Sequence, residues 1–377
     1  MNFLSLLPNG SIVLFIVFCI VILIQLFYFL FFFLRLAVYK PVNKPISQTH
    51  PVSVIICARD EAGNLAAYLP GILVQSYPTS HEVIVVNDNS FDDSKYFLEE
   101  LKKSFKQLHV IELTQEAKLI PGKKFPLAIG IKSAKHEIVL LTDADCIPAS
   151  ENWISHMQST YNDNTEIVLG YSPFQKMNGF LNKLIRWECF HSALQYLSYA
   201  LAGKPYMGVG RNLSYKKSLF LQQKGFASHH NIPGGDDDLF INQAANKYNT
   251  QINIHPESFV LTKPASTWKQ WMRQKKRHYS TSKYYKRSHK LLLGLFAFTH
   301  FLTLPLFVAA CFTPLWKWSI LAFFIKLITQ WIVYGKSMIK LNEKDLIPYL
   351  LFFDIWMFFY YLIFAPALIK KPSQSWK

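Results

Sequence analysis

The chain has 377 residues, a formal net charge of +16 and 16% aromatic residues. This length accommodates one large α/β domain plus membrane segments, and the aromatic content is high for a soluble enzyme. Its five cysteines are widely scattered, without a C-x-x-C pair, which argues against a disulfide framework or a cysteine-based zinc site. Many basic residues lie between Lys263 and Lys290, directly before an apolar run, so their position favours a membrane surface over nucleic acid.

Residues 12–34 form an apolar run without a charge, long enough to cross a hydrocarbon core of roughly 30 Å as a helix. Arg35, Lys40 and Lys44 follow this run, whereas a secretory signal carries its positive charges before the apolar segment. We therefore expect residues 1–40 to form an uncleaved N-terminal transmembrane anchor, with the following chain in the cytoplasm.

The middle of the chain alternates between strand-like and helix-like patterns. Short β-branched runs at residues 52–57, 82–86, 108–113 and 137–142 are typical of buried parallel strands. Apolar residues at helical spacing between them predict crossover helices at residues 64–74, 92–105 and 124–134. The pattern predicts half of a doubly wound α/β domain. Further helices near residues 151–161 and 181–201 extend the same domain, which we expect to cover residues 50–285.

Apolar blocks follow at residues 291–312, 318–334 and 346–369, which predicts a C-terminal membrane region of two to three helices over residues 288–370. Lys336, Lys340 and Lys344 after the second block fit a cytoplasmic loop, whereas Lys370 and Lys371 after the third do not. Either the charge rule is broken at the tail, or one C-terminal segment is interfacial or re-entrant.

Acidic residues follow the fourth predicted strand. Asp143 and Asp145 occupy alternate positions, which share a face while the strand continues. Carboxylates at a strand end suit Mg²⁺ or Mn²⁺. Polar residues also follow the first two strands, and open α/β sheets bind ligands at the carboxyl ends of their strands, so we expect one shared pocket. For Ser90, Asp92 and Asp93, a turn that caps the next helix is the competing interpretation.

These motifs together resemble those of the family 2 glycosyltransferases, which are inverting enzymes with the GT-A fold. A-R-D-E-A-G-N-L at residues 58–65 resembles the family's A-R-N-E-A-x-N-L, and V-N-D-N-S-F-D at residues 86–92 resembles V-D-D-x-S-x-D. G-K-K-F-P-L at residues 122–127 is similar to G-K-x-x-A-L, and D-A-D at residues 143–145 matches D-x-D. The resemblance covers roughly residues 51–280. It implies an α/β fold, namely a GT-A nucleotide-diphospho-sugar transferase domain with N-terminal and C-terminal transmembrane helices.

The resemblance also implies a nucleotide-sugar site with a UDP-sugar as the expected donor. Asn87 replaces the first Asp of its motif, which leaves Asp88 as the acid expected to contact the base. The resemblance implies that Lys123 reaches toward the nucleotide. We interpret its neighbour Lys124 as an ordinary surface residue. The divalent cation, Mg²⁺ or Mn²⁺, is expected on Asp143 and Asp145. The residues implied to bind the nucleotide sugar are Ala58, Arg59, Glu61, Asp88, Lys123, Asp143 and Asn212.

Two further segments resemble the family's catalytic motifs. G-G-D-D-D-L at residues 234–239 takes the place of the E-D motif, whose Asp deprotonates the acceptor hydroxyl. The resemblance implies Asp237 as this base, with Asp236 as its competitor and Asp238 as the cap of a helix over residues 239–245. Q-K-K-R-H at residues 274–278 resembles Q-x-x-R-W, which implies that Gln274 and Arg277 help to hold the diphosphate and the acceptor. His at the Trp position argues against processive synthesis.

The expected function is inverting transfer of a sugar to a lipid or cell-envelope saccharide acceptor. We expect a multi-pass protein of the cell (inner) membrane with a cytoplasmic catalytic domain and no nucleic-acid partner. The alternative is a nucleotide-binding membrane transporter or scaffold without transferase turnover. Few charges that would mark a transport path lie in the apolar segments, and Lys326 and Asp354 are the main candidates.

Overall fold

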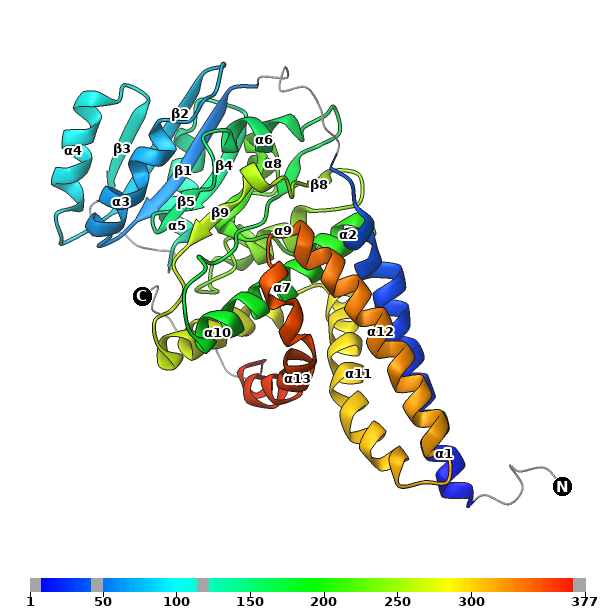
Figure 1. The fold of residues 1–377 in the computed structure, drawn as a ribbon. Helices are drawn as coiled ribbons and strands as arrows, with labels where there is room; N and C mark the ends of the chain where they lie inside the picture. The colour runs from blue at the N-terminus through cyan, green and yellow to red at the C-terminus, as the bar shows by residue number, and fades with distance from the viewer. Residues whose placement is uncertain (1–7, 42–49, 114–121, 369–377) are drawn as a thin grey trace. The chain divides into compact units, whose positions relative to one another are not determined.

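The computed structural model describes residues 8–41, 50–113 and 122–368. The described chain divides into two compact units (Figure 1). One unit comprises residues 8–39 and 286–368, and the other comprises the described part of residues 40–285.

The larger unit is built on a seven-stranded sheet with the strand order β3-β2-β1-β4-β7-β6-β8. Its first four strands are parallel and confirm the predicted runs: β1 (Val52–Ala58), β2 (His81–Asp88), β3 (Leu108–Leu113) and β4 (Ile138–Asp143). The expected burial of β3 is wrong, because β3 lies at the edge of the sheet and is only partly buried. The sheet continues through β7, which is antiparallel to β4, as expected for an extension of the same domain. The remaining strands of this sheet are β6 (Ile167–Leu169), β7 (Leu213–Lys216) and β8 (Thr250–Ile252).

The helices of this unit lie between and after the strands. They are α3 (Ala62–Leu73), α4 (Ser94–Ser104), α5 (Lys124–Ser133), α6 (Trp153–Ser159), α7 (Phe180–Leu201), α8 (Lys217–Gln222), α9 (Asp238–Ala244) and α10 (Trp268–Ser282). Three short 3-10 turns are η4 (Gly210–Asn212), η5 (Ala227–His229) and η6 (Pro256–Ser258). A separate antiparallel ribbon pairs β5 (Cys146–Pro148) with β9 (Val260–Thr262), so that β5 leads away from the end of β4.

Every residue of β1 is buried, because helices cover both faces of the sheet. On one face, Val54 packs in a single cluster with Leu69 of α3 and Trp153 of α6. On the other, a Cβ atom added to Gly130 of α5 would lie 2.7 Å from Ile55 Cγ2, so glycine allows α5 to approach the sheet closely. Close packing on both faces fixes the edge where β1, β2 and β4 end.

The smaller unit is helical. Four helical stretches are long and apolar enough to cross a membrane: residues 9–38, 287–311, 316–340 and 344–367. The third predicted C-terminal block begins in a 3-10 turn through Pro348, because proline lacks the N–H that a continuous α-helix would use. The elements are α1 (Asn9–Phe27), the π-helical η2 (Tyr28–Phe33), α2 (Leu34–Val38), α11 (Arg287–Cys311), α12 (Trp316–Lys340), η7 (Lys344–Tyr349), α13 (Leu350–Phe364) and η8 (Ala365–Leu368).

The two charges singled out in the apolar segments are paired with each other. The Lys326 ammonium on α12 lies 3.2 Å from Asp354 Oδ2 on α13. Asp354 Oδ1 also accepts a hydrogen bond of 2.8 Å from Gln330 and lies 3.3 Å from His300 Nε2 on α11. Buried charges in apolar surroundings persist when they are paired in this way, and the cluster links three helices of the unit.

Candidate functional site

The loops that follow β1 and β2 are joined by hydrogen bonds. The Asp60 amide donates to Ser90 Oγ over 2.9 Å, and the Phe91 amide donates to Asp60 Oδ1 over 2.8 Å. The Ala62 amide donates to Asp92 Oδ2 over 2.8 Å. Ser90 and Asp92 therefore act as turn residues, as the competing interpretation expected, and they hold the two strand ends together.

The predicted nucleotide residues of these loops lie along one edge of the sheet. Ala58 and Asp88 are buried at the ends of β1 and β2, whereas Arg59 and Glu61 are partly exposed. Asn87 donates to Glu112 Oε2 over 2.8 Å and accepts from Ser90 Oγ, so its amide is committed within the protein. Of Asn87 and Asp88, it is therefore Asp88 that is favoured to contact the base of a nucleotide.

The end of β4 carries an ion pair. The Lys123 ammonium contacts the Asp143 carboxylate. Burial alone would raise the pKa of Asp143, but Lys123 holds that pKa below its usual value, with smaller contributions from Arg211 and Arg277. Burial and then the neighbouring Asp143 charge raise the pKa of Asp145. The two acids of the D-x-D motif therefore repel each other, and of the two only Asp143 forms an ion pair with a described lysine.

This acidic pair fits a divalent cation. Ligand atoms of Asp143, Asp145 and Cys146 all lie within 4.8 Å of one another. Burial and the neighbouring carboxylates raise the pKa of Cys146 well above its usual value, and Mg²⁺ and Mn²⁺ prefer oxygen to sulfur ligands. Two carboxylates remain, and these are the ligands that Mg²⁺ and Mn²⁺ prefer. A cation between them would offset the repulsion that raises the pKa of Asp145.

The loop with three consecutive acids begins at a required glycine. Gly235 has a φ of +84°, and a Cβ atom there would lie 2.4 Å from Leu239 Cδ1. Asp237 caps α9, because its Oδ1 accepts from the Asp238 amide over 2.7 Å. Its Oδ2 accepts from the Gly210 amide over 2.8 Å. Burial, followed by the charges of its two acidic neighbours, raises the pKa of Asp237 to about 7.

The expectation that Asp238 is the helix cap is wrong. Asp238 Oδ2 accepts hydrogen bonds from Thr281 Oγ1 over 2.5 Å and from the Tyr285 hydroxyl over 2.8 Å. These partners lie at and just beyond the end of α10, so Asp238 ties the acidic loop to that helix. Capping falls to Asp237 because α9 begins one residue earlier than predicted.

Asp236 differs from both neighbours. Its partly exposed carboxylate makes no hydrogen bond and no ion pair with any described residue. Its charge nevertheless acts on Lys123: burial lowers the pKa of that lysine, but Asp143 and then Asp236 raise it well above its usual value. Asp236 is thus the uncommitted carboxylate of the loop, and its charge acts on Lys123.

The expectation that Lys124 lies on the surface is also wrong. Only 1% of this residue is exposed. Its ammonium donates to the carbonyl oxygens of His229 over 2.6 Å and of Ile232 over 2.7 Å. Burial lowers the pKa of Lys124 to about 8. Lys124 therefore holds the segment that leads into the acidic loop.

Asn212, expected to contact the nucleotide sugar, is fully buried and uses its amide internally. Its Nδ2 donates to the carbonyls of Tyr171 and Ser258, each over 2.8 Å. Its Oδ1 accepts from Trp153 Nε1 over 3.0 Å. The geometry favours a structural role, because both N–H groups and the carbonyl oxygen already have protein partners.

The residues of α10 differ in their relation to the candidate site. A buried ion pair between Lys275 and Glu188 anchors α10 to α7. Arg277 is within electrostatic reach of Asp143, since it contributes to the lowered pKa of that acid, whereas the Gln274 side chain makes no hydrogen bond with a described residue. No role was predicted for Arg211. Its guanidinium carbon lies 4.7 Å from the centre of the Phe174 ring, and its charge acts to lower the pKa of Asp145. Its signal in the sequence is its position directly before Asn212, which the family resemblance implied for nucleotide-sugar binding.

Lys124→Met is expected to destabilise the protein by about 1–3 kcal/mol, because two buried carbonyl groups lose their charged donor. Turnover should also fall, because the acidic loop loses one of its anchors. Lys132→Met, on the exposed side of the same helix, is the matched control. Thermal unfolding and transfer rates measured for both variants test the assignment. Equal behaviour of Lys124→Met and the control would contradict it.

Comparisons with known proteins bear on the family and the fold. The profile described as Glycosyl transferase family 2 matches residues 53–224, and that described as Glycosyl transferase family group 2 matches residues 153–368, more than half of the chain. A mannosyltransferase from Pyrobaculum calidifontis, solved in complex with GDP-Man and Mn²⁺, has a TM-score of 0.57 and 17% sequence identity. That alignment covers 92% of this chain and 98% of the other, and the likeness is one of fold.

Curated relatives match over shorter lengths. Glycosyltransferase AglE of Haloferax volcanii is 27% identical over 192 residues, which is 49% of this chain and 58% of that protein. Beta-monoglucosyldiacylglycerol synthase of Nostoc is 31% identical over 101 residues, which is 26% of this chain and 21% of that protein. The chain thus spans only part of the length of the curated relatives that it matches. On the family profiles, with the α/β sheet and the acids at its edge, the chain belongs to the family 2 glycosyltransferases.

Proposed function

We propose that the chain is an inverting, metal-dependent glycosyltransferase that moves a sugar from a nucleotide-diphosphate donor to a lipid or cell-envelope saccharide. The observation that carries this proposal is an uncommitted carboxylate, Asp236, whose charge acts on Lys123, the lysine that is paired with Asp143. A base and a charged diphosphate site must lie close together if one displacement is to join the acceptor oxygen to the sugar.

The donor side of the site is assigned to the edge where β1, β2 and β4 end. Arg59, Glu61 and Asp88 would line the nucleoside, and Lys123 with Arg277 would bind the diphosphate. Asp143 and Asp145 would hold Mg²⁺ or Mn²⁺, whose charge neutralises the leaving diphosphate when it is bound. Lys123 would then exchange its contact with Asp143 for the phosphate oxygens.

We assign the proton-accepting role to Asp236 in preference to Asp237. Both oxygens of Asp237 already accept backbone N–H groups, which fixes its carboxylate in the cap of α9. Its raised pKa is consistent with a base, but a proton accepted there would weaken the bonds that hold the loop. Asp236 can accept the proton of an acceptor hydroxyl without that loss.

Support for the substrates comes from the relatives. The Nostoc relative is named for a glycolipid product, which supports a lipid acceptor. The family motifs support a UDP-sugar donor. The Pyrobaculum mannosyltransferase was solved with GDP-Man and Mn²⁺, so a GDP-sugar is the competing donor and Mn²⁺ a plausible cation.

We further propose that residues 1–40 and 288–370 lie in the cell membrane and that residues 50–285 form the catalytic domain on its cytoplasmic side. The support is the apolar length of the four helical stretches, with Arg35, Lys40 and the basic stretch up to Lys290 flanking the domain. A cysteine introduced at the exposed Glu100 should resist an impermeant thiol reagent in intact cells and react after the membrane is opened. Labelling in intact cells would reject this orientation.

Asp145→Ala is expected to abolish divalent-dependent donor binding, because the site loses one of its two carboxylates. Asp143→Ala should weaken binding less, as the family resemblance implies for the first acid of the motif. Calorimetric titration of the donor nucleotide with and without Mn²⁺ measures both effects. Unchanged metal-dependent binding by Asp145→Ala would rule out this metal site.

Asp236→Asn should lose about 10²- to 10⁴-fold in turnover while donor affinity stays near wild type, because the variant keeps the shape and removes the base. Asp237→Asn, the matched control, should cost about 1 kcal/mol of stability through the weakened cap and retain more activity. It should also remove a pH effect. With the pKa of Asp237 raised from 3.8 to about 7, wild-type stability falls as pH rises between those values.

The contrast between these two variants decides the assignment. An inactive Asp237→Asn beside a nearly normal Asp236→Asn would make Asp237 the base, as the sequence comparison first implied. Two active variants would show that the acidic motif is structural.

A further inference from the structure

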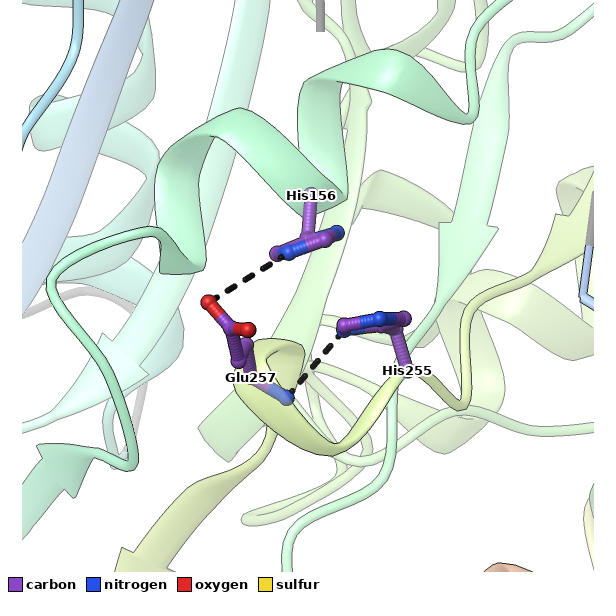
Figure 2. Close-up of side chains that lie close together, drawn as sticks. All are labelled: His156, His255 and Glu257. Atoms are coloured by element: carbon purple, nitrogen blue, oxygen red, sulfur yellow. Dashed lines mark hydrogen bonds and ion pairs between the residues drawn. The ribbon is translucent and has the colours of Figure 1, made fainter. Parts of the chain in front are cut away.

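A cluster of two histidines and one glutamate lies outside the proposed catalytic site. His156 of α6 faces His255 and Glu257 of the η6 segment (Figure 2). One ligand atom from each residue can be chosen so that all three atoms lie within 4.8 Å of one another. The proposed transfer reaction uses none of these residues.

The backbone beneath the cluster is held by one buried amide. Asn253 Nδ2 donates to the carbonyl oxygen of His156 over 2.7 Å, and its Oδ1 accepts from the His255 amide over 2.9 Å. Only 8% of Asn253 is exposed. The two histidines are therefore held at a fixed separation by bonds that do not involve their rings.

Glu257 is oriented by its own partners. Its Oε2 accepts from Asn152 Nδ2 over 2.7 Å and from Ser150 Oγ over 3.1 Å. The bond from Asn152 is the main reason that the pKa of Glu257 lies below its usual value. His156 Nε2 lies 3.6 Å from the same oxygen. That distance is longer than a good hydrogen bond and close to the separation of about 3.3 Å between two ligands of one tetrahedral zinc ion.

The two imidazole rings are stacked, with centroids 3.8 Å apart and an interplanar angle of 15°. The neutral imidazole ring is the form that binds metals. Ring lone pairs lie in the ring plane, so the stacked rings must turn about their Cβ–Cγ bonds to reach one ion. His255 Nδ1 would give up only a long bond of 3.3 Å from the Glu257 amide.

We propose that His156, His255 and Glu257 form a second metal site, selective for zinc-like transition ions over Mg²⁺. Two imidazole nitrogens and one carboxylate match a known ligand set of Zn²⁺, with a remaining position for water, whereas Mg²⁺ prefers oxygen ligands alone. The site would clip α6 to the segment that leads into β9. That strand carries Thr262, whose hydroxyl lies 3.3 Å from Asp145 Oδ2, so the clip would stiffen the ribbon beside the catalytic acids.

Zinc titration of the full chain in detergent, after chelator treatment, tests the proposal. Wild type should bind Zn²⁺ in the presence of excess Mg²⁺, and its unfolding temperature should rise with Zn²⁺ concentration. His255→Gln and Glu257→Gln should each weaken binding at least about 100-fold, since loss of an outer partner alone typically costs 10- to 100-fold. Asn152→Ala, which removes such a partner of Glu257, should show that smaller loss.

Two controls locate the ion. His230→Gln, a change at an exposed histidine outside the cluster, should bind Zn²⁺ like wild type, and so should Asp145→Ala. Displacement of Zn²⁺ by Mg²⁺, or its loss in Asp145→Ala, would place the ion at the D-x-D acids and overturn the proposal. Wild-type affinity in both His255→Gln and Glu257→Gln would overturn it as well. Circular dichroism without metal shows that each variant is folded before it is compared.

Discussion

Two adjacent lysines at the start of α5 hold the two sides of the site together. Lys123 contacts Asp143 at the end of β4, and Lys124 binds the carbonyls of His229 and Ile232 ahead of the acidic loop. Positive charge at a helix N-terminus is unfavourable, because the helix dipole is positive there. The arrangement persists because each ammonium has strong acceptors, and a local rule broken in this way is typical of a functional site.

Three sets of hydrogen bonds hold the acidic loop in place, and they leave the Asp236 carboxylate available to bind a substrate. Lys124 holds the preceding segment, the Gly210 amide holds Asp237, and Thr281 with Tyr285 holds Asp238. These hydrogen bonds involve residues before and after Asp236, and none of them involves the Asp236 carboxylate. Consecutive acids in one loop thus acquire different roles because their partners differ, although their side chains are chemically identical.

Much of the architecture could be predicted because it depends on local patterns. β-branched runs such as residues 52–57 mark buried strands, and alternate acids at the end of β4 mark the edge of a parallel sheet. What the sequence could not show are partners far apart in the chain. The burial of Lys124 depends on carbonyls more than a hundred residues away. The amide of Asn212 is saturated by Trp153, Tyr171 and Ser258, which no spacing rule connects. The cluster of His156, His255 and Glu257 could not be predicted for the same reason, because His156 is distant in sequence from the other two.

The activity proposed for this chain is transfer of a sugar from a nucleotide diphosphate. The most direct measurement incubates the purified chain, in lipid, with a panel of radiolabelled UDP- and GDP-sugars, with Mn²⁺ or with chelator, and identifies the labelled product. The account predicts that one donor labels a lipid or saccharide acceptor and that chelation stops the reaction. Donor binding without any transfer to the lipids and envelope saccharides of the source membrane would contradict it.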